Sequence, residues 1–168
     1  MRDEARIIAC IPRLRRYARA LVGRRDEADD LVQDTLERAW SKLRLWRPGS
    51  DPRVWLFSIM HNVHVDQVRY RRARPAEVLG DDALEIPAQV APHDVLQLRR
   101  LAFALDRLAP AQREVLLLVA LEGLTYDETA RALGIPVGTV MSRLSRGRDG
   151  LRALMAGGAT AASLRLVE

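Results

Sequence analysis

Residues 125–148 decide the fold, and they read TYDETARALGIPVGTVMSRLSRGR. Thr125 and Glu128 have the spacing of a capping box, in which the Thr oxygen and the Glu carboxylate bind free N–H groups at the start of a helix. Gly134 is expected to end that helix. After the turn, a second helix from about Thr139 is predicted to bury its apolar residues and expose its arginines. A short helix, a glycine turn and a basic helix predict a helix-turn-helix.

The sequence just before this motif is also helical in pattern. Residues 96–108 and 112–121 carry apolar positions at helical spacing and are separated by Ala109 and Pro110. No segment has a convincing strand pattern, and there is no internal repeat. The sequence therefore predicts an all-α chain.

The first 75 residues predict three further helices. Apolar residues recur every three or four positions from Asp26 to Leu43. Asp51 can cap a helix that has Pro52 in its first turn and runs to about Arg72. The segment before Asp26 supplies the third apolar stripe. The predicted core positions are Ile7, Ile8, Ile11, Leu14, Tyr17, Ala18, Leu21, Ala28, Leu31, Val32, Thr35, Leu36, Ala39, Trp40, Leu43, Trp55, Leu56, Ile59, Met60 and Val63. Three helices can close a small core around them.

Charge divides the 168 residues into parts. The chain has 27 basic and 22 acidic residues and a net charge of +5. Residues 1–75 carry net +7, residues 76–97 net −5 and residues 98–168 net +3. The middle segment lacks periodicity and contains prolines, so it is interpreted as a flexible acidic linker. The expected organisation is two small helical domains, 1–75 and 98–155, joined by the linker 76–97 and followed by a frayed tail, 156–168.

Three blocks of sequence carry a family resemblance. They are DDLVQDTLERAW at 29–40, WLFSIMHNV at 55–63 followed by Asp66 and Arg69, and residues 105–140, which include the helix-turn-helix. In this order they resemble the extracytoplasmic-function (ECF) sigma factors of bacterial RNA polymerase. The resemblance implies region 2, a three-helix bundle for core binding and promoter opening, in the first domain. It implies region 4, the minus-thirty-five reader, in the second.

The resemblance also implies site residues. The candidates for binding core RNA polymerase are Asp30, Gln33, Asp34 and Glu37. The candidates for minus-ten DNA are Arg47, Arg53, Asn62, Asp66, Arg69, Arg71, Arg72 and Arg74, with the loop 47–53 around a flipped base and the arginines near the end of the helix on phosphates. Trp55 is left out of this set because it lies on the apolar stripe. The candidates for minus-thirty-five DNA are Thr139, Met141, Ser142, Arg143, Arg146 and Arg148. Many relatives have Arg in place of Met141, and an aromatic residue or His in place of Ser145, which puts the minus-thirty-five sequence in doubt.

Partners and alternatives follow from the same analysis. The expected partners are core RNA polymerase, promoter DNA and an anti-sigma factor, with no cofactor, metal or small-molecule substrate. The acidic linker is either a solvated spacer or a mimic of nucleic acid inside polymerase. Because no signal peptide or apolar span is visible and Cys10 is the only cysteine, a cytoplasmic protein is expected. A stand-alone helix-turn-helix regulator and a helical protein-binding adaptor remain as alternatives. An enzyme is disfavoured because no catalytic motif is present.

Overall fold

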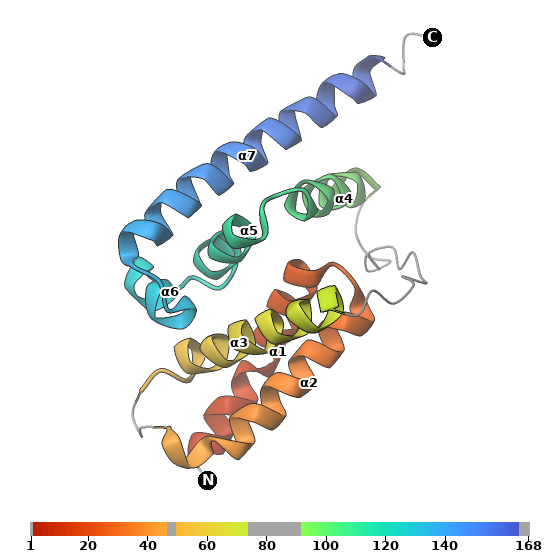
Figure 1. The fold of residues 1–168 in the computed structure, drawn as a ribbon. Coiled ribbons are helices and arrows are strands. Elements are labelled where there is room, and N and C mark those ends of the chain that lie inside the picture. Colours follow the sequence, from red (N-terminus) through yellow and green to blue (C-terminus); the bar gives the residue numbers. More distant parts are fainter. Residues whose placement is uncertain (1, 47–49, 74–91, 165–168) are drawn as a thin grey trace.

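The computed structural model describes residues 2–46, 50–73 and 92–164. Within these ranges the chain is helical and contains no strand. The elements are α1 (Arg2–Val22), α2 (Arg25–Ser41), the short 3₁₀ helix η1 (Leu43–Leu45), α3 (Pro52–Ala73), α4 (Pro92–Asp106), α5 (Pro110–Leu116), the π-helical turn η2 (Leu117–Leu121), α6 (Tyr126–Leu133) and α7 (Val137–Leu164). Figure 1 shows α1 to α3 in one half of the molecule and α4 to α7 in the other. The predicted all-α fold is confirmed.

Helices α1, α2 and α3 form the predicted three-helix bundle. Tyr17 of α1 and Phe57 of α3 meet edge to face in its core, with ring centroids 5.0 Å apart. Leu31 of α2 and Leu56 and Met60 of α3 are completely buried. Two predicted core residues are on the surface instead, because Ile8 is 54% exposed and Trp40 is 51% exposed. Both lie at the edge of an apolar stripe, where a small rotation of the helix about its axis decides whether a side chain is buried.

The second half is built around the predicted helix-turn-helix. Thr125 Oγ1 accepts the N–H of Glu128, and the Glu128 carboxylate accepts the N–H of Thr125, which confirms the capping box. Gly134 ends α6 in the left-handed conformation, at φ 64°. Val140 and Leu144 of α7 are buried against α5 and α6. The helix-turn-helix therefore forms as the sequence indicates.

Several helix ends differ from the expectation. Helix α4 begins at Pro92 rather than Leu96, so the helical part starts inside the segment assigned to the linker. Helix α7 continues to Leu164, so most of the expected frayed tail is helical. Pro92 at a helix start is favourable because it needs no N–H partner, and the small residues of 153–164 are mostly good helix formers. The acidic stretch 76–91 lies outside the described residues.

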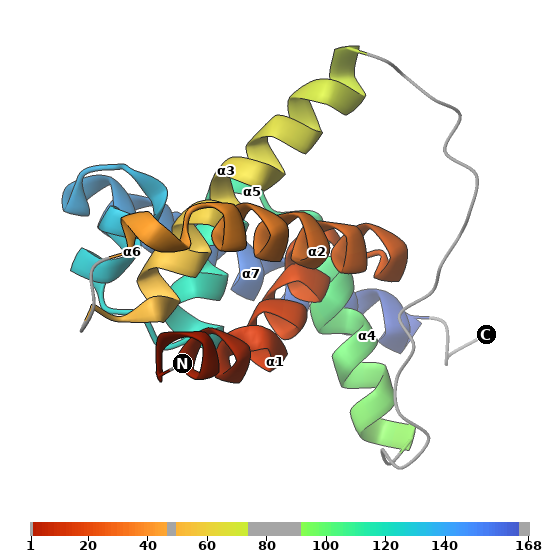
Figure 2. The ribbon, with the colours of Figure 1, turned by 90° about the horizontal axis from the view of Figure 1, so that it is seen from below.

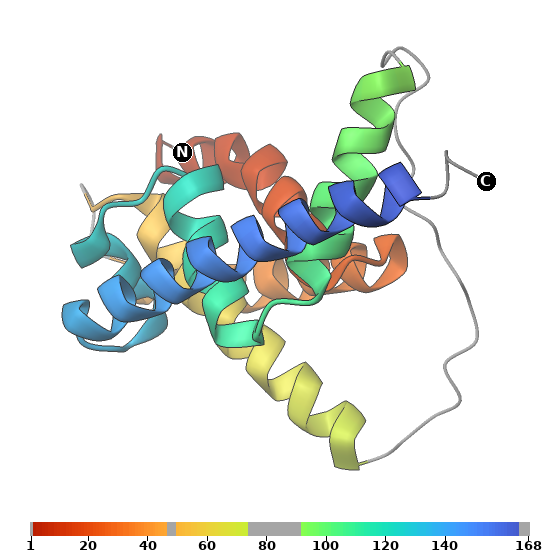
Figure 3. The ribbon, with the colours of Figure 1, turned by 90° about the horizontal axis from the view of Figure 1, so that it is seen from above.

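The two halves pack directly on each other. Helix α6 lies along α3, and η2 and α4 contact α1. Seen from below and from above, the last turns of α3 project beyond the bundle (Figures 2 and 3). Helix α7 crosses α4 and α5 on the side that faces away from α1 to α3, and it is in front in Figure 3. The surfaces of both halves that the sequence assigns to ligands can therefore be placed relative to each other.

Candidate functional site

The four candidate core-binding residues lie on one exposed face of α2. Asp30, Gln33, Asp34 and Glu37 are all exposed, and Gln33 Nε2 donates to Glu37 Oε1 over 3.1 Å. Their opposite face, with Leu31 and Thr35, is buried in the bundle. The amphipathic pattern thus orients the polar row outward, as predicted.

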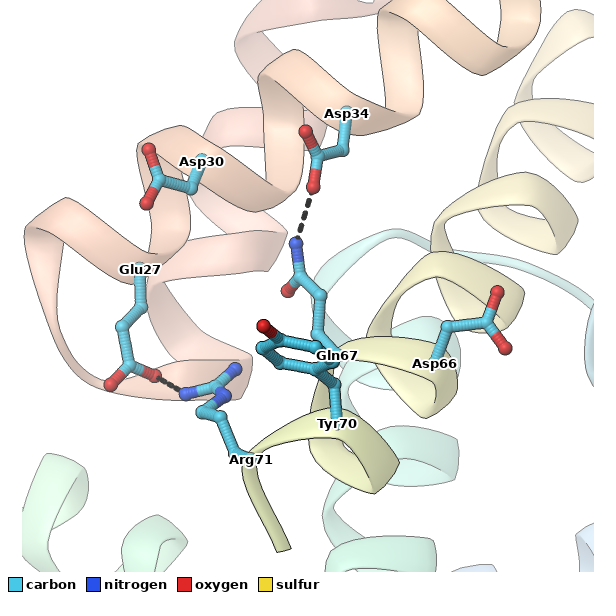
Figure 4. Close-up of a pocket in the computed structure, with 7 residues that line it drawn as sticks. All are labelled: Glu27, Asp30, Asp34, Asp66, Gln67, Tyr70 and Arg71. Atoms are coloured by element: carbon cyan, nitrogen blue, oxygen red, sulfur yellow. Dashed lines mark hydrogen bonds and ion pairs between the residues drawn. The ribbon is translucent and has the colours of Figure 1, made fainter. Parts of the chain in front are cut away.

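Helix α3 completes this face as an acidic groove. The groove has a volume of about 580 Å³ and lies between α2 and α3. It is lined by Glu27, Asp30, Asp34, Asp66, Gln67, Tyr70 and Arg71. Figure 4 shows Gln67 reaching Asp34, and Arg71 reaching Glu27 across the groove. The Gln67 Nε2 to Asp34 Oδ2 distance is 2.7 Å.

The groove contains residues that sequence reasoning missed. Glu27, Gln67 and Tyr70 were not among the candidates, and Tyr70 is 61% exposed. Glu27 precedes Asp30 by three residues and Tyr70 follows Asp66 by four, so helical spacing alone places each beside a candidate. Four carboxylates face one arginine here, which gives the groove a negative charge suited to a basic partner.

Asp66 belongs to this groove by its contacts. The sequence predicts that it binds minus-ten DNA in a row with Asn62 and Arg69, and in the structure its carboxylate accepts from Arg38 of α2 over 2.9 Å. Asn62 instead donates to the Ser58 carbonyl oxygen of its own helix. Arg69 lines a different cleft. The three residues have the spacing of one row on α3, but their side chains have three different surroundings in the structure.

A second pocket lies at the start of α3. It has a volume of about 460 Å³ and is lined by Leu45, Trp46, Ser50, Asp51, Val54, Trp55, Ser58 and Arg131. The rings of Trp46 and Trp55 stack with centroids 5.7 Å apart and planes 11° apart. Trp55 is half-buried: it packs against the core, as its place on the apolar stripe predicts, and also lines this pocket. An aromatic wall beside polar groups is suited to an unstacked base.

Asp51 and Arg53 are paired at the edge of this pocket. Asp51 accepts the Arg53 N–H at the start of α3 and holds its guanidinium, with 2.7 Å between Oδ2 and Nη2. The hydrogen bonds from Arg53 lower the pKa of Asp51 below its usual value. Arg53 is therefore neutralised by its neighbour in this arrangement. Arg47 and Arg74, two other candidates, lie outside the described residues.

A third cleft runs between the two halves and is strongly basic. It has a volume of about 490 Å³, and its charged and titratable lining residues are Glu27, His61, His64, Arg69, Arg71, Arg72, Arg113, Glu114 and Arg143. It brings Arg143 of α7 beside the arginine cluster of α3. Burial lowers the pKa of His64 below 6.5, and its Nδ1 has no hydrogen-bond partner. One residue predicted to bind minus-thirty-five DNA therefore lines the same cleft as residues predicted to bind minus-ten DNA.

The remaining candidates lie along α7. Met141 is 54% exposed, and Arg146 and Arg148 are exposed. Thr139 and Ser142 are partly buried, and Ser142 Oγ donates to the Thr139 carbonyl oxygen over 3.1 Å. The exposed arginines and Met141 are thus available to a ligand at the start of the recognition helix.

The described part of the chain lacks two features of other classes of protein. No group of three or more His, Cys, Asp or Glu side chains that could hold a metal ion occurs there. None of the helices in 2–46, 50–73 and 92–164 has the length and apolar character needed to cross a membrane.

Comparison with known proteins identifies the family. Residues 7–61 match the family described as the Sigma2 domain of PhyR, and residues 98–150 match Sigma-70, region 4. The chain is 39% identical over 155 residues to the ECF RNA polymerase sigma factor EcfG of Rhodopseudomonas palustris, covering 92% of this chain and 84% of that protein.

Solved structures agree in fold. The sigma factor RpoE from Bartonella quintana, in complex with the anti-sigma factor NepR, superposes with a TM-score of 0.79 at 34% identity, over 93% of this chain and 98% of that chain. CnrH in complex with the cytosolic domain of CnrY superposes with a TM-score of 0.67 at 32% identity, over 90% of this chain and 85% of that chain. The chain belongs to the family of ECF RNA polymerase sigma factors.

Proposed function

We propose that this sigma factor binds core RNA polymerase through the acidic groove between α2 and α3. The observation that carries the proposal is the set of carboxylates from both helices around one groove, with Gln67 of α3 bonded to Asp34 of α2. A groove of this charge attracts a basic surface, and exposed Tyr70 adds apolar contact area next to the charges. The contact set is Glu27, Asp30, Gln33, Asp34, Glu37, Asp66, Gln67 and Tyr70.

We infer that promoter DNA is divided between two other surfaces. The pocket with Trp46 and Trp55 takes an unpaired minus-ten base, and Asn62 lies one turn beyond Ser58, which lines that pocket. Arg69, Arg71 and Arg72, at the projecting end of α3, bind the phosphates next to that base. The start of α7 reads minus-thirty-five DNA through Thr139, Met141, Ser142, Arg143, Arg146 and Arg148. We assign the half with α1 to α3 to the expected domain 1–75 and the half with α4 to α7 to the expected domain 98–155, although α4 begins at Pro92 and α7 ends at Leu164.

We further propose control by an anti-sigma factor. The similar sigma factor RpoE has been solved together with the anti-sigma factor NepR, and CnrH with the cytosolic domain of CnrY. The described residues form two helical domains that contain no separate sensory unit. The inhibitor acts in the cytoplasm, where polymerase is found. The chain itself catalyses no reaction, since the chemistry of RNA synthesis belongs to polymerase.

A matched pair of aspartates tests the core-binding surface. Asp34 and Asp29 are both exposed on α2, but only Asp34 lines the groove. Asp34→Ala is expected to weaken binding to core RNA polymerase roughly tenfold, as for a central interface residue, and Asp29→Ala by less than about twofold. The measurement is a fluorescence titration of labelled full-length chain with core enzyme. Equal effects of the two substitutions would contradict the proposed groove.

A further inference from the structure

The basic cleft between the two halves carries more positive charge than its own residues balance. Five arginines and two glutamates line it, and the arginines belong to α3, α5 and α7. Both carboxylates already have partners. Glu27 accepts from Arg71, and Glu114 Oε1 lies 2.6 Å from Nδ1 of His61. The other arginines of the cleft are therefore left without a counter-charge from its lining.

Three of these arginines have neither an ion pair nor a hydrogen bond with any residue that the structure describes. They are Arg69 and Arg72 on the last turns of α3, and Arg143 near the start of α7. Like charges placed side by side repel one another, so an anion between these three guanidinium groups would stabilise the arrangement. A guanidinium group binds phosphate through two parallel N–H···O hydrogen bonds, which makes phosphate the best-fitting anion.

Two buried nitrogen atoms in the lining also lack partners within the described ranges. One is Nε of Arg113 on α5, and the other is Nδ1 of His64 on α3. Buried polar atoms in folded proteins nearly always have a hydrogen-bond partner, and an exception indicates a place where a ligand can supply one. The cleft therefore shows two independent signs of a polar ligand, its uncompensated charge and its unpartnered buried nitrogens.

The rest of the lining is apolar. It consists of side chains from α1, α3 and the start of α5, namely Leu21, Val22, Val65, Val68, Pro110 and Ala111. The volume of about 490 Å³ is within the range of sites for single small molecules. An apolar wall next to guanidinium groups suits a ligand that has an apolar part as well as phosphates.

We propose that this cleft binds a small molecule of the nucleoside polyphosphate class. Arg69, Arg72 and Arg143 hold its phosphates, and its nucleoside lies against the apolar lining. A phosphate group offers three acceptor oxygens and each guanidinium fork uses two, so three forks require more than one phosphate. The same arginines are proposed above to contact promoter DNA, so ligand and promoter would compete for them. Only this competition rests on the proposed function.

Isothermal titration calorimetry of the purified full-length chain tests the ligand class. The buffer contains about 150 mM salt, to screen weak surface attraction, and no magnesium. ATP or GTP is expected to bind at a ratio of one to one and roughly tenfold more tightly than AMP, because AMP lacks the additional charged hydrogen bonds. Adenosine is expected to show no binding. Tripolyphosphate, which has a similar charge and no nucleoside, is expected to bind roughly tenfold more weakly than ATP. Absence of binding by both ATP and GTP, or equal binding of tripolyphosphate, would overturn the proposal.

Three arginine variants with the same change in net charge test the site. Arg72→Ala and Arg143→Ala remove contacts from two different helices, and each is expected to weaken nucleotide binding roughly tenfold. Arg152→Ala removes an exposed arginine of α7 that pairs with Asp149 and does not line the cleft, and an effect of less than about twofold is expected. Circular dichroism checks that all three variants keep wild-type helicity. Equal weakening by all three would indicate non-specific attraction to a basic chain and would overturn the site.

A short single-stranded oligonucleotide separates this ligand from nucleic acid. If the oligonucleotide binds in the same calorimetric experiment while ATP and GTP do not, the cleft is a DNA surface alone and the inference is wrong. The titrations contain neither polymerase nor promoter, so their outcome is independent of the core-binding experiment that tests the proposed function.

Discussion

Two glycines of the helix-turn-helix, four residues apart, are expected to respond in opposite directions to the same substitution. Gly134 ends α6 at φ 64° and ψ 34°, in the left-handed region. Gly138 lies in the first turn of α7 and does not have a positive φ. A Cβ added at either position would meet no atom within 4 Å. Any difference between the two alanine variants therefore reports backbone conformation and not crowding.

The magnitudes follow from the two conformations. Left-handed backbone costs an alanine about 1 to 2 kcal/mol, and part of this is offset because alanine has less freedom than glycine in the unfolded chain. Gly134→Ala is expected to lower the free energy of unfolding by about 1 kcal/mol. Gly138→Ala is expected to raise it by about 0.5 to 1 kcal/mol, since alanine is the better residue in a helix.

Urea denaturation of the full chain, followed by circular dichroism, measures both changes. A shift of 1 kcal/mol corresponds to about 2 to 4 °C in melting temperature for a chain of this size, so thermal unfolding gives a second reading. If Gly134→Ala were neutral, or if Gly138→Ala destabilised the chain as much, the assigned conformations of the turn and of α7 would be wrong.

Three other predictions concern single residues. Thr125→Ala removes one half of the capping box of α6 and is expected to lower the free energy of unfolding in urea by about 1 kcal/mol. Thr125→Ser is expected to stay close to wild type. Unchanged stability of Thr125→Ala would contradict the prediction. Burial lowers the pKa of His64 below 6.5 in the folded chain, so the unfolded chain binds more protons at acidic pH. The free energy of unfolding is therefore expected to fall as the pH drops below about 6.5. His64→Gln should flatten this pH dependence, and the control His93→Gln, at an exposed position, should not. Burial also raises the pKa of the Cys10 thiol above 9.0, so its reaction with a disulfide reagent at neutral pH is expected to be slow until urea unfolds the chain, and rapid labelling of the folded chain would contradict its placement.

The local features of the fold could be predicted because short-range rules decide them. The capping box at Thr125, the glycine at 134 and the cap by Asp51 before Pro52 each depend on residues within four positions. The apolar stripes likewise placed Leu31, Leu56 and Val140 in the core. At the edges of the stripes the same rule failed for Ile8 and Trp40. Periodicity predicts which side of a helix is buried, but not how far around the helix its neighbours cover it.

The site was predicted only in part because it depends on contacts between helices. Helical spacing gave the exposed row on α2, yet the partner residues Gln67 and Tyr70 follow from how α3 packs beside it. The position of Asp66 on α3 predicts a contact with DNA, but its contact with Arg38 depends on how α2 packs and could not be predicted from spacing. Glu114 and Glu122 looked like ordinary polar residues in the sequence. Their burial depends on the packing of one half against the other, over more than 50 positions in the chain.

The central claim is that this sigma factor reads promoters only together with polymerase. A gel-shift experiment with purified full-length chain, core RNA polymerase and a labelled promoter fragment selected by run-off transcription measures it directly. The chain alone is expected to leave the fragment unshifted at concentrations where chain and core together shift it completely, and core alone is expected to give no specific complex. Equally tight and specific retention of the fragment by the chain alone would contradict the claim and indicate a stand-alone DNA-binding regulator.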